Sequence, residues 1–325
     1  MAYTTIDDPG SYFNTVLYTG NDSTQSITGV GFQPDWVWLK RRDSARGHTV
    51  YDASRGATYG VYPDLASGQS VGATALTAFN SDGFTVGADD RVSGSGYTYV
   101  SWNWKESATA GFDIVTYTGN GTDDTDISHN LSAVPKMIIV KNLDAADAWQ
   151  VYHAGNTAAP ETDYLVLNET NATADAADRW SDEAPTSSVF TLGDADEVNT
   201  DTEDYIAYCF AEKQGYSKFG SFTGNGDADG PFIYTGFQPA YVFYKVTSTT
   251  SDWYIQDNKR LTYNVNNTRL EANNTDAEVT GAADSIDMLS NGFKLRWQSA
   301  SFNASGATYV YAAFAEAPLV NSNGV

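Results

Sequence analysis

The tetrapeptide Tyr-Thr-Gly-Asn stands at residues 18–21 and again at residues 117–120, and Phe-Thr-Gly-Asn stands at residues 222–225. Each copy is followed by a proline and a short apolar run, and a lysine stands six positions past the proline every time, in segments 34–40, 135–141 and 239–245. A period of about a hundred residues, present three times, predicts three structural units of one type. It also makes a single-site enzyme less favoured, because tandem repeats build arrays and extended surfaces.

The run after each proline is apolar at successive positions and not only at alternate ones. Two and four positions past the proline stand the pairs Trp36 and Trp38, Met137 and Ile139, and Tyr241 and Phe243. The positions between them are apolar as well, which predicts a central strand covered on both faces. The lysines that follow, Lys40, Lys141 and Lys245, are expected to mark the exit of this strand to solvent.

Each repeat ends in a strand of strict alternation that begins at Tyr99, Tyr205 or Tyr309. One face of this strand carries bulky residues and the other carries small ones, which predicts a strand packed between two layers. Cys209 lies on the small face and is interpreted as a packed small residue, not as a nucleophile.

Short strands separated by Gly, Asn, Asp and Ser turns predict an all-β fold of three tandem antiparallel β-sandwiches, jelly-roll-like in type. The predicted repeats are residues 15–112, 113–215 and 216–316, with arms at 1–14 and 317–325. The joints are short, so the sandwiches are expected to sit close together, as a stiff rod or a compact cluster.

Composition excludes several classes of function. The 325 residues carry a formal net charge of −23, which disfavours binding to nucleic acid and to anionic bilayers. Neither a membrane span nor a signal peptide is expected from the sequence, and one cysteine allows no intramolecular disulfide. The acidity itself has two interpretations, solubility or a surface that collects divalent cations.

Copies one and three share an Asp-x-x-Arg pattern, Asp52 with Arg55 and Asp257 with Arg260, where copy two has His153. A local ion pair that stabilises a turn is the favoured interpretation, and a ligand-reading pair is the alternative. Positions such as His153, which do not recur, are the expected location of copy-specific binding.

No catalytic, cofactor-binding or metal-ligating residue is predicted, because the sequence contains no zinc-protease, phosphate-loop, dinucleotide or nucleophile-elbow motif. The best metal candidate is the loop Asn225–Gly230, whose alternate Asn and Asp residues are similar to the start of a calcium loop. Gly236 stands where that loop needs a glutamate, so a solvated acidic turn is favoured. Trp180 and Trp297 fit the repeat least and are the candidates for contact with sugars.

Three runs carry a resemblance to a known group of proteins: GFQPDWVWLKRRDSARGHTVYDASRGAT at 31–58, YTGNGTDDTDISHNLSAVPKMIIVKNLDAADAWQVYH at 117–153, and YIAYCFAE at 205–212. They resemble repeats in virion proteins of tailed bacteriophages, especially marine and cyanobacterial ones, and the two ends of the chain are similar to the ends of such proteins. The resemblance covers essentially the whole chain. It implies a location in the virion, and it supplies no catalytic residues.

These observations together predict a non-enzymatic virion structural protein, a homo-oligomeric tail fibre or appendage component that contacts the host surface. Its expected partners are other virion proteins and a host-surface glycan or receptor, with no cofactor, no nucleic acid and no membrane insertion. Weak sites on repeated modules gain by avidity when many copies are displayed. The alternatives are a capsid-decorating or head-fibre protein and, less favoured, a carbohydrate-active enzyme.

Overall fold

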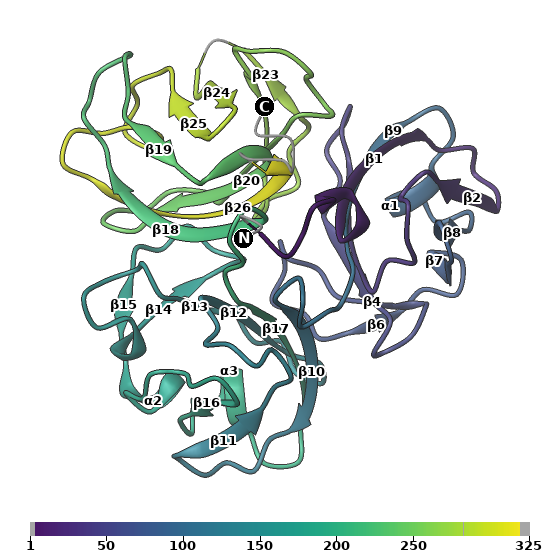
Figure 1. The fold of residues 1–325 in the computed structure, drawn as a ribbon. Helices are drawn as coiled ribbons and strands as arrows, with labels where there is room; N and C mark the ends of the chain where they lie inside the picture. The colour runs from purple at the N-terminus through teal and green to yellow at the C-terminus, as the bar shows by residue number, and fades with distance from the viewer. Residues whose placement is uncertain (1–3, 282, 319–325) are drawn as a thin grey trace.

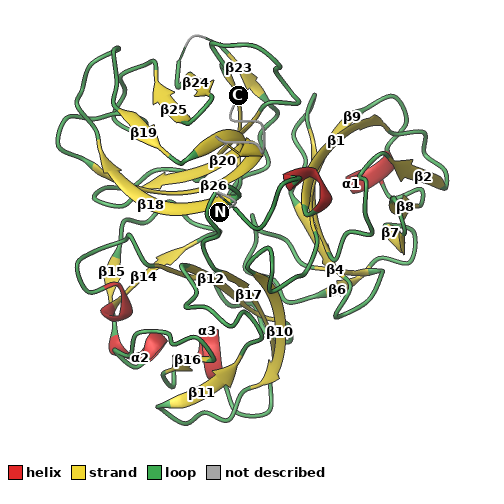
Figure 2. Ribbon diagram, in the orientation of Figure 1, coloured by secondary structure: helices red, strands yellow, loops and turns green. Residues whose placement is uncertain are grey.

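The computed structural model describes residues 4–281 and 283–318, and nearly all of its regular structure is antiparallel β-sheet. Figure 2 shows the few short helices as single turns at the edges of the sheets. The predicted all-β class is therefore confirmed. In Figure 1 the chain forms three lobes around a common centre, and each lobe turns its larger sheet toward that centre.

The first lobe has an inner sheet in the order β1-β9-β3-β4, an outer sheet in the order β2-β8-β7, and the small pair β5-β6. Their bounds are η1 (Pro9–Ser11), β1 (Phe13–Thr19), β2 (Gln25–Thr28), β3 (Trp36–Arg41), β4 (Thr49–Asp52), β5 (Tyr59–Gly60), β6 (Ser70–Val71), β7 (Leu76–Asn80), β8 (Gly83–Val86), α1 (Asp90–Ser93) and β9 (Thr98–Trp104).

The second lobe has an inner sheet in the order β10-β17-β12-β13-β14-β15 and the outer pair β11-β16. Their bounds are β10 (Phe112–Thr118), β11 (Thr125–Ser128), β12 (Met137–Asn142), β13 (Gln150–His153), η2 (Pro160–Thr162), β14 (Asp163–Val166), β15 (Ala174–Asp175), α2 (Ala177–Trp180), β16 (Val189–Leu192), α3 (Asp196–Asn199) and β17 (Asp204–Phe210).

The third lobe has an inner sheet in the order β18-β26-β20-β21-β22-β23 and an outer sheet in the order β19-β25-β24. Their bounds are β18 (Ser217–Thr223), β19 (Phe232–Tyr234), β20 (Phe237–Val246), β21 (Tyr254–Asp257), β22 (Thr268–Glu271), β23 (Val279–Thr280), β24 (Ile286–Leu289), β25 (Gly292–Leu295) and β26 (Thr308–Pro318). The first four strands of each inner sheet follow the same order, so the sequence repeat is also a repeat of strand pairing.

The hydrophobic core has two levels. Each lobe has its own cluster between inner and outer sheet, for example Val37 and Leu39 with Phe84 in the first lobe. A larger cluster fills the centre and takes residues from all three lobes, among them Trp36, Phe210 and Phe314. The lobes are therefore joined by one apolar core, and the boundaries predicted between the repeats remain predictions.

The apolar runs after each proline explain both levels. Successive residues of a strand point to opposite faces. Trp36 and Trp38 enter the central cluster, while Val37 and Leu39 enter the cluster of their own sandwich. The strand was predicted to be covered on both sides, and it is. Its second cover is supplied by the neighbouring repeats.

The repeated tetrapeptide serves close packing. A Cβ atom on Gly20, Gly119 or Gly224 would lie 2.2–2.3 Å from a backbone carbonyl oxygen of the turn before the closing strand, so only glycine fits. The aromatic residue two positions before the glycine stacks on the first tyrosine of that strand, with ring centroids 4.8–5.2 Å apart in the pairs Tyr18–Tyr99, Tyr117–Tyr205 and Phe222–Tyr309.

The expectation that the lysines mark an exit to solvent is wrong. Lys40, Lys141 and Lys245 are fully buried, and each Nζ donates hydrogen bonds to backbone carbonyl oxygens of the loop that follows its strand. Burial disfavours the charged ammonium and lowers the pKa of each lysine to about 8. Each lysine thus lies on an inner strand of its sheet, and its ammonium group holds the following loop from inside.

The N-terminal segment is not a free arm over its described part. Ile6 is 2 % exposed and belongs to the central cluster, and η1 leads from it directly into β1. The predicted C-terminal arm begins inside β26 and otherwise lies outside the described residues. Cys209 is buried in the core cluster of the second sandwich, together with Ala207 and Ala211, and packs there as expected; burial raises the pKa of its thiol.

Candidate functional site

The Asp-x-x-Arg pairs are buried ion pairs. Asp52 with Arg55 and Asp257 with Arg260 lie 2.6 and 2.5 Å apart, with side chains at most 4 % exposed. The backbone N–H groups of both arginines also donate to these carboxylates, so each pair closes a turn. The predicted structural role is confirmed, because both pairs close turns in the interior of the protein. Arg55 also lines a cavity of about 470 Å³ between the first two lobes.

The same positions link the lobes into a closed ring. Asp52 accepts a hydrogen bond from the Tyr208 hydroxyl at 2.8 Å, and Asp257 accepts one from Trp102 Nε1 at 2.9 Å. In the second lobe His153 Nε2 donates to the carbonyl oxygen of Tyr311 at 3.1 Å. The first lobe thus contacts the second, the second contacts the third, and the third contacts the first.

His153 is therefore not a site of copy-specific binding. It is 1 % exposed, its Nδ1 accepts from the N–H of Gly155, and burial lowers its pKa to about 4. A neutral imidazole makes here the contact between lobes that a carboxylate makes in the other two copies. From the sequence alone, a residue that differs from its counterparts in the other repeats can be either exposed or buried.

A second set of polar contacts closes the ring in the opposite sense. Trp149 Nε1 donates to the carbonyl oxygen of Tyr62 at 3.0 Å, and Trp253 Nε1 donates to that of Val166 at 2.8 Å. His48 occupies the matching position in the first lobe, 3.0 Å from the carbonyl oxygen of Glu271. These contacts bind each lobe to both of its neighbours.

The two tryptophans proposed for sugar contact differ in accessibility. Trp180 is 2 % exposed and packs edge-on against Tyr152, which excludes it from any surface site. Trp297 is 37 % exposed and stays available. The acidic loop is held by its own polar groups, since Asp229 pairs with Lys294 at 3.0 Å and Asn225 Nδ2 donates to the Asp229 carbonyl oxygen. Within residues 4–281 and 283–318, no group of three or more His, Cys, Asp or Glu side chains is arranged to hold a metal ion.

The most perturbed carboxyl group lies at the joint between the first two lobes. Glu106 Oε1 accepts from the N–H of Ile114, and burial together with the adjacent Asp113 raises the pKa of Glu106 to about 7. Asp113 in turn accepts from the N–H of Asn130 at 2.6 Å. Both carboxyl groups fix backbone, and neither lines the cavities described below.

Glu106 makes stability fall as pH rises. Its pKa is higher in the folded state than in the unfolded chain, so the folded state binds more protons between about pH 4.5 and pH 7. We expect Glu106→Gln to stabilise the protein at pH 8 by about 1 kcal/mol, after allowance for partial exposure, and to change little at pH 4.5. Urea unfolding at the two pH values measures this. The matched control is Glu212→Gln, the same position of the second repeat, and an equal gain at both pH values for Glu106→Gln would contradict the assignment.

Two adjoining cavities share two lining residues of the third lobe. The larger one lies within this lobe, and the smaller one lies between this lobe and the first. The larger, about 430 Å³, is lined by residues that include Gln238, Asn258, Tyr263 and Asn264. The smaller, about 220 Å³, lies beside Asn14 and Thr15 of β1 and the N-terminal segment. Lys259 and Glu316 line both cavities and form an ion pair of 3.4 Å. We call the two cavities together the third-lobe groove.

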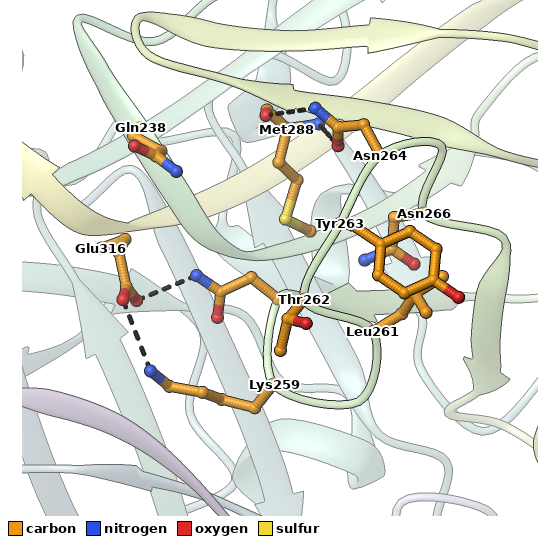
Figure 3. A pocket seen from close by; sticks show the side chains of 10 residues that line it. Gln238, Lys259, Leu261, Thr262, Tyr263, Asn264, Asn266, Met288 and Glu316 are labelled. Carbon is orange, nitrogen blue, oxygen red and sulfur yellow. Dashed lines mark hydrogen bonds and ion pairs between the residues drawn. The ribbon is translucent and has the colours of Figure 1, made fainter.

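The groove is formed by features specific to the third lobe. β20 and β26 extend beyond their counterparts, pairing Phe237 with Pro318 and Gln238 with Ala317 after a shift in register. The extension places Glu316 and Gln238 on one wall, and the loop after β21 forms the other (Figure 3). Asn264 fixes that loop through two hydrogen bonds of 2.9 Å with the backbone of Met288.

The groove was not predicted from the sequence, although the third copy departs from the repeat at two residues near it. Nineteen and twenty positions past the proline, Asn258 and Lys259 stand where the first two copies have Ala53 with Ser54 and Ala154 with Gly155. The backbone is equivalent there, because the N–H groups of Ala53, Ala154 and Asn258 donate to the carbonyl oxygens of Asp35, Lys136 and Ala240. Longer polar side chains thus enter the boundary between lobes only in the third copy.

A family model matches residues 8–318, which is nearly the whole chain. Its description is "Domain of unknown function (DUF7483)". Comparisons with the curated proteins and with the solved structures gave no match. No helix among the described residues is long and apolar enough to cross a membrane. The match extends across all three lobes, and the chain belongs to the DUF7483 family.

Proposed function

We propose that this protein is a non-enzymatic structural component of a phage virion, a tail fibre or appendage part that contacts the host surface through its third lobe. The resemblance of the repeats to virion proteins supports the location. A body whose three lobes share one core and a closed ring of polar contacts suits a rigid, long-lived particle component. Other virion proteins are the proposed permanent partners, and the protein assembles as a homo-oligomer.

The third lobe carries the observation on which the contact role depends. Its outer strand β19 turns Phe232 and Tyr234 to solvent, 44 % and 54 % exposed, on either side of the buried Ile233. Strand register gives the equivalent positions of the other two lobes, which are Ser26 and Thr28 in β2, and Asp126 and Ser128 in β11. Two copies keep a polar outer face and one copy exposes aromatic rings. Exposed aromatics that replace polar residues on a repeated frame are typical of a contact surface.

The proposal assigns no catalytic step to the chain. A glycosidase needs two carboxyl groups flanking a bound sugar. Burial raises the pKa of Glu106 to about 7, and the carboxyl oxygens of Glu106 and Asp113 accept hydrogen bonds from the backbone N–H groups of Ile114 and Asn130. Glu316 in the groove is engaged by Lys259 and by Asn258 Nδ2. These carboxylates hold structure.

Location and contact are tested on intact particles and on purified protein. We expect gold-labelled antibodies against the chain to decorate the tail or its appendages in electron micrographs of the virion. The purified protein is expected to bind host cells and to reduce adsorption of the phage in competition. Label on the head together with no binding to cells would overturn the appendage role and favour a capsid-decorating protein. Pre-immune serum and a phage lacking the gene serve as controls.

A further inference from the structure

The third-lobe groove contains hydrogen-bonding groups that the protein itself leaves unused. Thr15 is 6 % exposed and lines the smaller cavity, and its Oγ1 has no hydrogen-bond partner among the described residues. Asn258 lines the larger cavity, and its Oδ1 is likewise buried and without a partner in the described part of the chain. Buried polar atoms are normally paired, and an unpaired one costs about 1–3 kcal/mol. One such oxygen belongs to a lining residue of each of the two adjoining cavities, where a ligand hydroxyl group would supply the missing partner.

The rest of the lining suits the same chemistry. Tyr263 is 70 % exposed at the wall of the larger cavity, on the side away from Gln238 and Glu316 (Figure 3). Gln238 extends from the opposite wall and has an amide that can donate and accept. An aromatic face with several amide groups and almost no buried charge matches a molecule that has apolar ring faces and a rim of hydroxyl groups.

Electrostatics limit the charge of that molecule. Among the described residues that line the groove, Asp8 and Glu316 are the acidic ones and Lys259 is the single cation, and the whole chain carries −23. An anionic ligand would meet repulsion both in the groove and on approach. A neutral ligand meets neither effect.

The loop that forms the outer wall is ordered in advance. Asn266 Nδ2 donates to the Asp257 carbonyl oxygen at 2.7 Å, and the carbonyl oxygen of Asn266 accepts from Gln256 Nε2 at 3.1 Å. With the two bonds between Asn264 and Met288, these contacts fix the side that follows Tyr263. The side that precedes it is fixed by the N–H of Arg260, which donates to Asp257 Oδ1 at 2.9 Å. A preformed wall lowers the entropy cost of binding.

We propose that the third-lobe groove binds a neutral oligosaccharide, with one sugar unit in each cavity. Tyr263 stacks on the sugar in the larger cavity, and Asn258 Oδ1 accepts from one of its hydroxyl groups. Thr15 Oγ1 exchanges a hydrogen bond with the sugar in the smaller cavity, and the chain of sugars passes over the Lys259–Glu316 pair. The identification of this sugar as a host-surface glycan rests on the proposed function, whereas the binding itself does not.

Saturation-transfer NMR on the full-length protein tests the proposal with defined probes. The probes are maltotriose, cellotriose, mannotriose and triacetylchitotriose, with trigalacturonate as the anionic comparison. We expect at least one neutral trisaccharide to bind, and to bind more strongly than trigalacturonate. We expect Tyr263→Ala and Asn258→Ala each to weaken that binding about tenfold or more, the loss typical of an anchor residue. Asn258→Ala installs the residue that the other two repeats carry, so the fold tolerates it.

Tyr234→Ala is the matched control, because Tyr234 is exposed on the same lobe and lies outside the groove. It should leave sugar binding unchanged. If none of the neutral trisaccharides binds, or if Tyr263→Ala binds as well as the unmodified protein, the proposal is wrong. These measurements use no virions, so their failure would leave the location in the particle untouched. Antibody labelling that missed the virion would equally leave sugar binding in the groove intact.

Discussion

Phe314→Ala is expected to destabilise the whole protein by about 3–5 kcal/mol, the usual cost of removing a buried phenylalanine. Phe314 is 3 % exposed, and its ring lies within 6.1 Å of rings from every lobe, namely Phe13, Trp104, Phe210, Tyr216, Phe219 and Tyr241. A cavity at this point weakens packing for all three repeats at once. Urea unfolding followed by tryptophan fluorescence and by circular dichroism measures the loss.

The form of the transition tests the shared core. We expect one cooperative transition by both probes, because no lobe has its inner sheet covered without the other two. Phe232→Ala is the matched control, since this phenylalanine is 44 % exposed and its removal should change stability by no more than about 0.5 kcal/mol. Two separate transitions, of which Phe314→Ala shifted only one, would show instead that the lobes unfold independently.

Arg260→Met is expected to cost about 3–5 kcal/mol because it leaves a buried carboxylate without its cation. Arg260 Nε donates to Asp257 Oδ2 at 2.5 Å, and both side chains are fully buried. The guanidinium also donates to Glu278 at 3.2 Å and to the Ile255 carbonyl oxygen at 2.9 Å. Methionine keeps the apolar stem and removes all of these donors. Urea unfolding of the variant measures the loss.

A double variant separates the buried charge from lost packing. Asp257→Asn together with Arg260→Met removes both charges, and we expect it to be more stable than Arg260→Met alone, since no uncompensated carboxylate remains. Lys218→Met breaks a partly exposed pair with Glu212, whose side chains are 35 % and 32 % exposed, and should cost less than about 1 kcal/mol. A double variant as unstable as the single one would mean that packing of the guanidinium, not its charge, dominates.

The strands and their two faces could be predicted from the sequence because they depend on the spacing of apolar residues close together in the chain. The continuous apolar run at residues 36–39 predicted a strand covered on both faces, and the strict alternation from Tyr99 onward predicted one bulky and one small face. The threefold repetition made each assignment independent of a single copy. The structural role of the Asp-x-x-Arg pairs followed from their spacing. Cys209 was placed correctly on a packed face for the same reason.

The third-lobe groove could not be predicted from the sequence in the same way. Thr15 and Asn258 lie 243 positions apart, and only the contact of the first lobe with the third brings their cavities together. The departure of Asn258 and Lys259 from Ala53 and Ser54 was visible in the sequence. Its meaning was not, because a non-recurring residue can be exposed, as Tyr263 is, or buried, as His153 is.

The sequence by itself therefore determined the strands, the two faces of each strand and the number of repeats, since a residue's alternation and propensity are set by its near neighbours. Tertiary structure alone decided that the tryptophan faces meet in one central core, that Lys40, Lys141 and Lys245 are buried, and that His153 joins two lobes. The physical reason is that burial belongs to a surface formed by distant segments. A strand specifies that one of its faces must be covered, and the closing of the three lobes on one another decides what covers it.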